Sequence, residues 1–343
     1  MQPAQKRLAE VKVMIIDPDA RLTEVIYRVL KGFGFQKVMA VRSGKRAISL
    51  MERETIDLLI CEWDMEEMSG LEVIEAIRSN KTPCPRDLPI IMLTGQSEQH
   101  HVLSARDTGV TEYLIKPFTA KTLSHRLIQV IDNPRLFVQS GRFIGPDRRR
   151  RKNNPEDTDP ENRKLTSEQM LRLSERMPDG RMRFRSDSST VFFTAPNKKI
   201  RELIGEEYPS KDIFSAEAIQ RAQQVLYESK DSFVKWIIED LDALEKAYAQ
   251  LEKNQRDIGA TVRIQQLAFN VMSQSGSFNF PLGSQVGKLL HDYVRDAQSA
   301  NLLVIRKHID TLYIIFEKRM EGEDQKVHSE VIAMLTSLIR KIG

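Results

Sequence analysis

Polar side chains follow the ends of several short apolar segments in the first third of the chain. The set comprises Asp17, Asp19, Glu62, Asp64, Thr94 and Lys116. Carboxylate oxygens are ligands for hard divalent cations, and a lysine can hold an anion beside such a cation. If the segments bring these groups to one place, the chemistry they could support is the cation-assisted binding of an anion.

The elements that would position these groups follow an alternating pattern. Apolar runs typical of buried strands lie at 11–16, 38–41, 56–61, 88–93 and 113–115. Segments with helical spacing lie between and after them, at 22–30, 45–51, 70–77, 101–108 and 120–131. Five strands alternating with five helices predict an α/β fold with a parallel sheet and helices on both faces. In such a sheet, the site lies beyond the carboxyl ends of the strands.

Four motifs in this region resemble the receiver domain of bacterial response regulators. They are IIDPDA from residue 15, CEWDMEEMSGLEVI from residue 61, IMLTGQS from residue 91 and EYLIKPF from residue 112. The resemblance covers residues 10–132 and implies the flavodoxin-like, CheY-like fold. It also implies a phosphoryl group accepted after the third strand and a magnesium ion held by an acidic pair after the first. By the same resemblance, Lys116 holds the phosphoryl group, and Thr94 and Tyr113 switch conformation together.

The chain departs from the family pattern at two positions. The phosphoacceptor position holds Glu62 in place of aspartate, which moves the carboxylate away from the in-line geometry of phosphoryl transfer. Pro18 replaces the second acid of the pair, so Asp17 remains as the candidate metal ligand, with Asp19 one residue late. We therefore expect a degenerate receiver, or pseudo-receiver, with no cofactor beyond weakly held Mg²⁺. Glu62 is either a mimic of the phosphorylated state or a tolerated replacement.

The rest of the chain divides into two parts. Residues 133–214 contain recurrent prolines and are predicted to form a charged linker, followed by a segment whose structure the pattern leaves open. Residues 215–343 are predicted to form an all-α helical bundle. The apolar face of its first long helix is formed by Phe233, Ile237, Leu241, Leu244, Tyr248 and Leu251.

One segment of the helical half, residues 268–294, resembles a histidine-phosphotransfer domain. In that alignment, Phe269 occupies the position of the phosphorylated histidine, while Met272 and Ser273 replace the lysine and glycine that follow it. Phenylalanine has no nucleophile, so the resemblance implies a degenerate domain. The alternative is a helical bundle with no such ancestry. We expect His100 and His101 to lie in a polar loop, and His308 at the surface or its boundary.

Composition sets limits on the partners. The chain has 343 residues, a formal net charge of +4 and only two cysteines, which excludes a disulfide framework. The basic run Arg148 to Lys152 lies next to Glu156, Asp157, Asp159 and Glu161. Its candidate contacts are nucleic acid, anionic lipid and an acidic surface, which is either the chain's own acidic block or that of a partner protein. We favour a solvated linker with an acidic contact of this last kind, because neither interleaved aromatic residues nor an adjoining amphipathic anchor is present. We expect a cytoplasmic chain with no membrane span, no nucleic-acid partner and no signal peptide.

These features predict a bacterial two-component signalling protein, acting in phosphorelay signal transduction through protein-protein interaction. Its partners would be other signalling proteins, and a homodimer through the receiver or the bundle is also open. We expect no enzymatic activity. One alternative is a working response regulator phosphorylated at Glu62 or Asp64. Others are a phosphotransfer or phosphatase enzyme in the helical half, and a DNA-binding regulator.

Overall fold

The computed structural model of the chain describes residues 7–141, 143–148, 167–185, 190–296, 301–322 and 324–342. By its contacts, the chain divides into two units. The first contains Met1–Leu114 and Ala120–Ala222, and the second contains Ile115–Thr119 and Gln223–Gly343. The short segment Ile115–Thr119 therefore belongs to the second unit, although it lies within the range predicted for the receiver.

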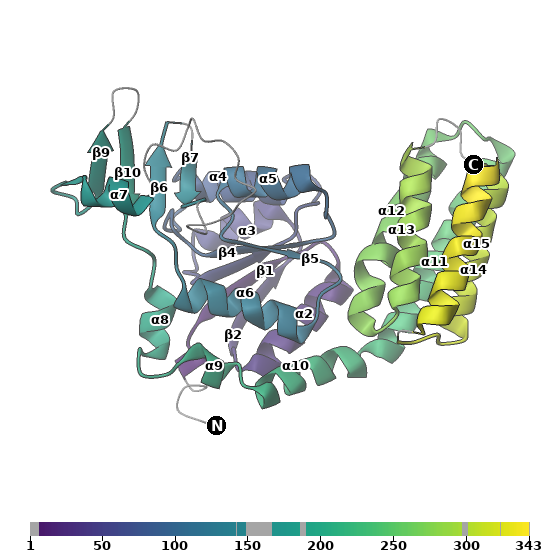
Figure 1. Cartoon of the computed structure of the whole chain (residues 1–343), viewed down its shortest axis with the longest axis horizontal. Helices are drawn as coiled ribbons and strands as arrows, with labels where there is room; N and C mark the ends of the chain where they lie inside the picture. The colour runs from purple at the N-terminus through teal and green to yellow at the C-terminus, as the bar shows by residue number, and fades with distance from the viewer. Residues whose placement is uncertain are drawn as a thin grey trace. The chain divides into compact units, whose positions relative to one another are not determined.

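A five-stranded sheet with the order β2-β1-β3-β4-β5 forms the centre of the first unit (Figure 1). Its strands are β1 (Lys12–Ile16), β2 (Lys37–Val41), β3 (Leu58–Cys61), β4 (Ile90–Thr94) and β5 (Glu112–Ile115). The helices between and after them are α2 (Ala20–Phe33), α3 (Gly44–Met51), α4 (Gly70–Arg78), α5 (Gln99–Thr108) and α6 (Ala120–Asp132). Strands β3 and β4 are buried along their whole length, as in parallel sheets covered on both faces. The predicted fold class is confirmed.

Local signals in the sequence set the ends of these helices. Helix α2 begins after Asp19, whose side chain accepts hydrogen bonds from the first-turn backbone N–H groups. It ends at Gly34, where φ is 118°, a left-handed conformation that favours glycine. Helix α4 begins with a capping box, in which Ser69 and Glu72 each bind the other's backbone N–H. The hydrogen bonds from Ser69 lower the pKa of the Glu72 carboxyl.

A second five-stranded sheet, with the order β7-β6-β10-β9-β8, lies where the sequence predicted a linker and an open segment. Its strands are β6 (Phe137–Ser140), β7 (Phe143–Pro146), β8 (Glu175–Arg176), β9 (Met182–Arg185) and β10 (Thr190–Thr194). All the described pairings are antiparallel. Helix α7 (Ser167–Arg172) packs on this sheet at β9, whereas α8 (Lys199–Ile204) and α9 (Ser210–Ile213) pack on α6. The core of this sheet is small and is built on Val138, Met170 and Phe193.

Most of the predicted charged run lies outside the described residues, including Arg149 to Lys152 and the four acidic residues that follow. Arg148 is described, and its guanidinium lies 3.7 Å from the centroid of the Phe143 ring. The run is bounded by β7 on one side and α7 on the other. Helix α7 packs on β9, so the elements on both sides of the charged run are parts of the same sheet unit.

A buried arginine joins the two sheets of the first unit. The Arg78 guanidinium donates hydrogen bonds to the backbone carbonyls of Gly109 and Leu88, at 3.0 and 2.9 Å. It also lies 5.6 Å from the centroid of the Phe137 ring on β6. Burial lowers the pKa of Arg78 to about 9, so the side chain stays charged at neutral pH. The role of this residue was not predicted from the sequence.

The second unit is helical. Helix α10 (Ala216–Glu228) crosses from the first unit into the second. It is followed by α11 (Lys230–Lys253), α12 (Ile258–Ser275), the short 3-10 helix η1 (Gly276–Phe278), α13 (Pro281–Asp296), α14 (Leu302–Glu317) and α15 (Gln325–Ile342). The apolar face predicted for the first long helix is buried on α11. None of the described helices is both long and apolar enough to span a membrane.

Aromatic packing and close backbone approach hold these helices together. The Phe233 ring stacks on Phe278 at a centroid distance of 4.2 Å, and Phe316 lies 5.2 Å from Phe280. Helices α12 and α13 approach closely at Gly287, where an added Cβ would lie 2.8 Å from the backbone nitrogen of Met272. A glycine is therefore needed on α13 at this crossing.

Two predictions about histidines are wrong. His308 is fully buried on α14, because it lies one helical turn from Val304 and shares the apolar face of the helix. Its Nδ1 lies 2.8 Å from the Val304 carbonyl oxygen, and burial lowers its pKa. His100 and His101 lie in the first turn of α5 rather than in a loop, because the helix begins at Gln99.

Candidate functional site

The two aspartates after β1 have different roles. Asp17 is buried, and its Oδ1 accepts a hydrogen bond from the backbone N–H of Asp19 at 2.9 Å. Asp19 Oδ1 accepts from the backbone N–H groups of Arg21 and Leu22, at 2.9 and 3.1 Å. Asp19 is therefore the N-cap of α2, a role that the sequence analysis did not assign to it.

Glu62 follows β3 and is buried, and its carboxylate turns back onto its own loop. Glu62 Oε1 accepts hydrogen bonds from the backbone N–H of Trp63 at 2.6 Å and of Asp64 at 3.4 Å. The Glu62 backbone N–H donates to the carbonyl of Ile16 on β1 at 2.8 Å. This bond holds the start of the β3–α4 loop beside the end of β1.

A residue that the sequence analysis did not single out connects the other predicted site residues. The Gln96 backbone N–H donates to Thr94 Oγ1 at 3.2 Å, and Gln96 Nε2 donates to Asp64 Oδ2 at 2.6 Å. The Tyr113 hydroxyl donates to the Gln96 carbonyl oxygen at 2.7 Å. We call these four residues the Gln96 network. Gln96 lies in the quoted IMLTGQS motif, but no residue-type signal marks its contacts there.

The surroundings of Tyr113 favour its protonated form. Burial raises the pKa of the Tyr113 hydroxyl, and the nearby carboxylates of Glu62 and Asp64 raise it further. The hydroxyl therefore remains a hydrogen-bond donor at any physiological pH. Its bond to Gln96 uses that proton.

Lys116 follows β5 directly and is buried. It lies in the Ile115–Thr119 segment, which by its contacts belongs to the second unit. Within that unit, the Phe118 backbone N–H donates to Ser277 Oγ at 2.8 Å. The structure thus brings Glu62, Asp64, Thr94 and Tyr113 together in the first unit and places Lys116 in the second.

The residues present do not fit the magnesium site that the receiver resemblance implies. Mg²⁺ needs oxygen ligands in near-octahedral geometry. Pro18 offers no carboxylate, and the neighbouring Asp19 carboxylate caps a helix. Asp17 and Glu62 each accept backbone N–H bonds on one carboxylate oxygen.

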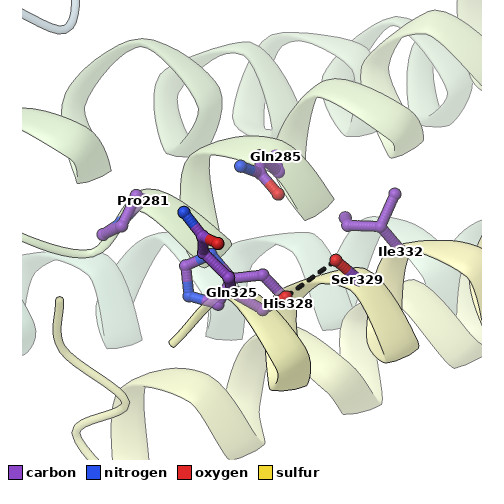
Figure 2. A pocket seen from close by; sticks show the side chains of 6 residues that line it. All are labelled: Pro281, Gln285, Gln325, His328, Ser329 and Ile332. Carbon is purple, nitrogen blue, oxygen red and sulfur yellow. Dashed lines mark hydrogen bonds between the residues drawn. The ribbon is translucent and has the colours of Figure 1, made fainter. Parts of the chain in front are cut away.

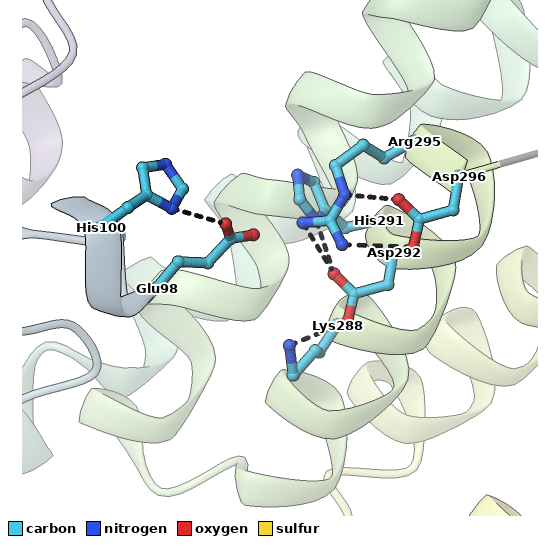
Figure 3. Close-up of polar contacts among 7 residues, drawn as sticks. All are labelled: Glu98, His100, Lys288, His291, Asp292, Arg295 and Asp296. Atoms are coloured by element: carbon cyan, nitrogen blue, oxygen red, sulfur yellow. Dashed lines mark hydrogen bonds and ion pairs between the residues drawn. The ribbon is translucent and has the colours of Figure 1, made fainter.

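In the helical unit, the predicted histidine-equivalent residue Phe269 lies on α12 and is half-buried. Its ring centroid is 5.5 Å from that of His291 on α13. His291 Nδ1 lies 3.1 Å from Asp292 Oδ1, and Lys288 Nζ lies 2.8 Å from Asp292 Oδ2 (Figure 3). A histidine with an acidic partner therefore lies beside Phe269, on the neighbouring helix.

A shallow pocket lies between α13 and α15 (Figure 2). Its volume is about 420 Å³, and it is lined by Pro281, Gln285, Gln325, His328, Ser329 and Ile332. The Ser329 hydroxyl donates to the backbone carbonyl of Gln325 at 2.7 Å. No carboxylate, lysine or arginine is among these lining residues, so they give a charged ligand little to bind.

The first unit is similar to known proteins. The family model of the response regulator receiver domain matches residues 13–128. The chemotaxis protein CheY homolog of Campylobacter jejuni is 32% identical over 122 residues, which cover 35% of this chain and 92% of that protein. Chemotaxis protein CheY-3 of Vibrio cholerae is 25% identical over 122 residues, covering 36% of this chain and 92% of that protein.

Two solved structures are also similar to part of this chain. A two-component response regulator from Clostridium difficile is 25% identical, with a TM-score of 0.33, and the match covers 36% of this chain and 98% of that chain. The structure of Vibrio cholerae chemotaxis protein CheY4 is 26% identical, with a TM-score of 0.32. That match covers 34% of this chain and 95% of the CheY4 chain.

Proposed function

The chain belongs to the response regulator receiver family through residues 13–128, and we propose that it is an adaptor in phosphorelay signalling whose receiver no longer accepts phosphate. It acts by binding other signalling proteins. The helical unit is proposed to supply a further binding surface rather than an enzymatic activity.

The observation that carries this proposal is the position of the Glu62 carboxylate. Oε1 of this residue accepts two backbone N–H bonds in its own loop, the shorter at 2.6 Å. These hydrogen bonds hold Oε1 in its own loop, so attack on a phosphoryl group by this oxygen would have to weaken them. Phosphoryl transfer depends on positioning and on neutralisation of charge, and both are compromised when the acidic pair is reduced to Asp17.

The Gln96 network supports a permanently held receiver conformation. The hydroxyls of Thr94 and Tyr113, which the family resemblance implies switch together, both bind the backbone of Gln96. Asp64 from the β3–α4 loop binds the side chain of the same residue. The network thus fixes the β4–α5 loop with groups that the chain itself provides. Glu62 contributes charge beside Tyr113, as a mimic of the phosphorylated state would.

Incubation with a small phosphodonor and Mg²⁺, followed by intact-mass measurement, tests the loss of phosphoryl transfer. The unaltered chain is expected to gain no mass. The matched variant carries Pro18→Asp and Glu62→Asp, which restore the family's acids, and it is expected to gain one phosphoryl group. A stoichiometric gain by the unaltered chain that disappears in Glu62→Gln would show that the receiver is functional.

A second candidate function, phosphotransfer in the helical unit, rests on His291. This histidine lies beside the Phe269 position and has Asp292 as its partner. Measuring the mass at alkaline pH would preserve an acid-labile phosphohistidine. A mass gain lost in His291→Gln but kept in His328→Gln would favour this candidate over the adaptor.

A further inference from the structure

We propose that Glu98, His100 and His101 bind one divalent transition-metal ion, such as Zn²⁺, at the first turn of α5. One potential ligand atom from each residue lies within 4.8 Å of the others. Within the described part of the chain, this is the only cluster of three histidine, cysteine or acidic residues with that geometry. It lies outside the Gln96 network and uses none of its residues.

The first two ligands are already paired. Glu98 Oε2 lies 3.2 Å from His100 Nδ1 (Figure 3). Glu98 occupies the N-cap position of α5, and its side chain makes no capping hydrogen bond there. The side chains of Glu98 and His100 are 48% and 65% exposed, which leaves them accessible to an ion from solution.

The third ligand is held by aromatic packing. The His101 ring lies 3.9 Å from that of His100 between centroids, and the Trp63 ring packs edge-on against it at 5.0 Å. Among the described residues, the buried Nδ1 of His101 has no hydrogen-bond partner. A buried polar atom without a hydrogen-bond partner costs free energy of folding. The ring nitrogens of neutral histidine are also common metal ligands in proteins.

The ligand set determines the kind of metal. Two imidazoles and one carboxylate suit Zn²⁺, Ni²⁺ or Cu²⁺, whereas Mg²⁺ prefers an all-oxygen shell. Two histidines and a glutamate are also a known zinc ligand set, in which water completes the tetrahedron. The three ligand atoms must move closer together than they lie here to bind one ion, and Glu98 and His100 are the two exposed side chains that would rotate to do so.

Binding of the metal ion would restrain the β4–α5 loop. Glu98 lies two residues after Gln96, so a metal joining Glu98 to the first turn of α5 would restrain the segment that receives the Tyr113 hydroxyl. Amide exchange in residues 94–98 is therefore expected to slow when the ion is bound.

Calorimetric titration of the full chain with Zn²⁺ tests the site. We expect one ion per chain. Glu98→Gln and His100→Gln change exposed side chains and should fold normally. Each should weaken binding by more than about tenfold, since even outer-shell partners of metal ligands contribute about 10–100-fold to affinity. His125→Gln alters an exposed histidine on α6 and is the matched control, expected to bind as the unaltered chain does.

Cu²⁺ quenching of tryptophan fluorescence gives a second readout. The Trp236→Phe background leaves Trp63, which packs on His101, as the single tryptophan. We expect stoichiometric Cu²⁺ to quench the Trp63 fluorescence, and we expect His101→Gln to abolish this quenching. Absence of Zn²⁺ binding by the unaltered chain, or equal affinity in both His100→Gln and Glu98→Gln, would overturn the proposal.

Discussion

Replacement of Tyr113 by phenylalanine isolates one bond of the Gln96 network. The change removes the hydroxyl that donates to the Gln96 carbonyl at 2.7 Å and leaves the ring in place. Because the ring packs against the receiver core, we expect the fold to be kept. The free energy that holds the β4–α5 loop closed should fall.

The size of the effect follows from the environment of the bond. A neutral hydrogen bond contributes about 0.5–1.5 kcal/mol net. Gln96 is half-buried, so water can replace the lost donor, and the cost should be close to about 1 kcal/mol. That figure corresponds to roughly fivefold faster local opening.

Hydrogen exchange measured by mass spectrometry reads this opening directly. Amides in residues 94–98 of Tyr113→Phe should exchange roughly fivefold faster than in the unaltered chain. Tyr27→Phe on α2 is the matched control, because it removes the same atom and the described residues provide no hydrogen bond to that hydroxyl. Unchanged exchange in Tyr113→Phe would refute the view that this hydroxyl restrains the loop.

Three further predictions use Trp63 and Trp236, which report separately on the first and second units. Gly287→Ala should destabilise the helical unit by about 1–3 kcal/mol in urea, because its Cβ would meet the Met272 backbone, whereas Gly259→Ala near the start of α12 should not. Asp19→Ala should lower the stability of the first unit by about 1 kcal/mol through loss of the α2 N-cap; unchanged unfolding would argue against capping. The stability of the helical unit should fall as pH drops below about 6.5, because burial lowers the pKa of His308 and only the unfolded chain readily takes up the proton. His308→Leu should make the stability of the helical unit less dependent on pH. If stability fell with pH equally in His308→Leu and in the unaltered chain, His308 would not be the group responsible.

Much of the first unit could be predicted because its signals are local. Short apolar runs mark the strands, and Gly34 and Ser69 mark helix ends by their residue types. The N-cap role of Asp19 was missed because an acidic residue at the end of a strand also fits a metal site. The contacts of Gln96 could not be predicted in this way. Two of its three bonds use backbone atoms, which every residue has, so the residue type carries no signal for them.

The second sheet could not be predicted because its pairing is non-local. Strand β6 pairs with β10, with Phe137 opposite Thr194, and charged sequence separates them. Each strand is short, and the buried core is small, so periodicity gives a weak signal. His308 was misplaced for another reason: a polar residue type was given more weight than its position on the apolar face of α14.

The position of the charged run between β7 and α7 determines which parts of the chain the run connects. Because the flanking elements belong to one sheet unit, the run connects two parts of that unit in the chain and does not connect two separate modules. For a flexible connection between two fixed ends, doubling the length costs only about 0.6 kcal/mol of closure entropy. The length of the run can therefore change without changing the segment of chain that connects the receiver to the helical unit. An inserted fluorescent protein should be tolerated there without uncoupling them.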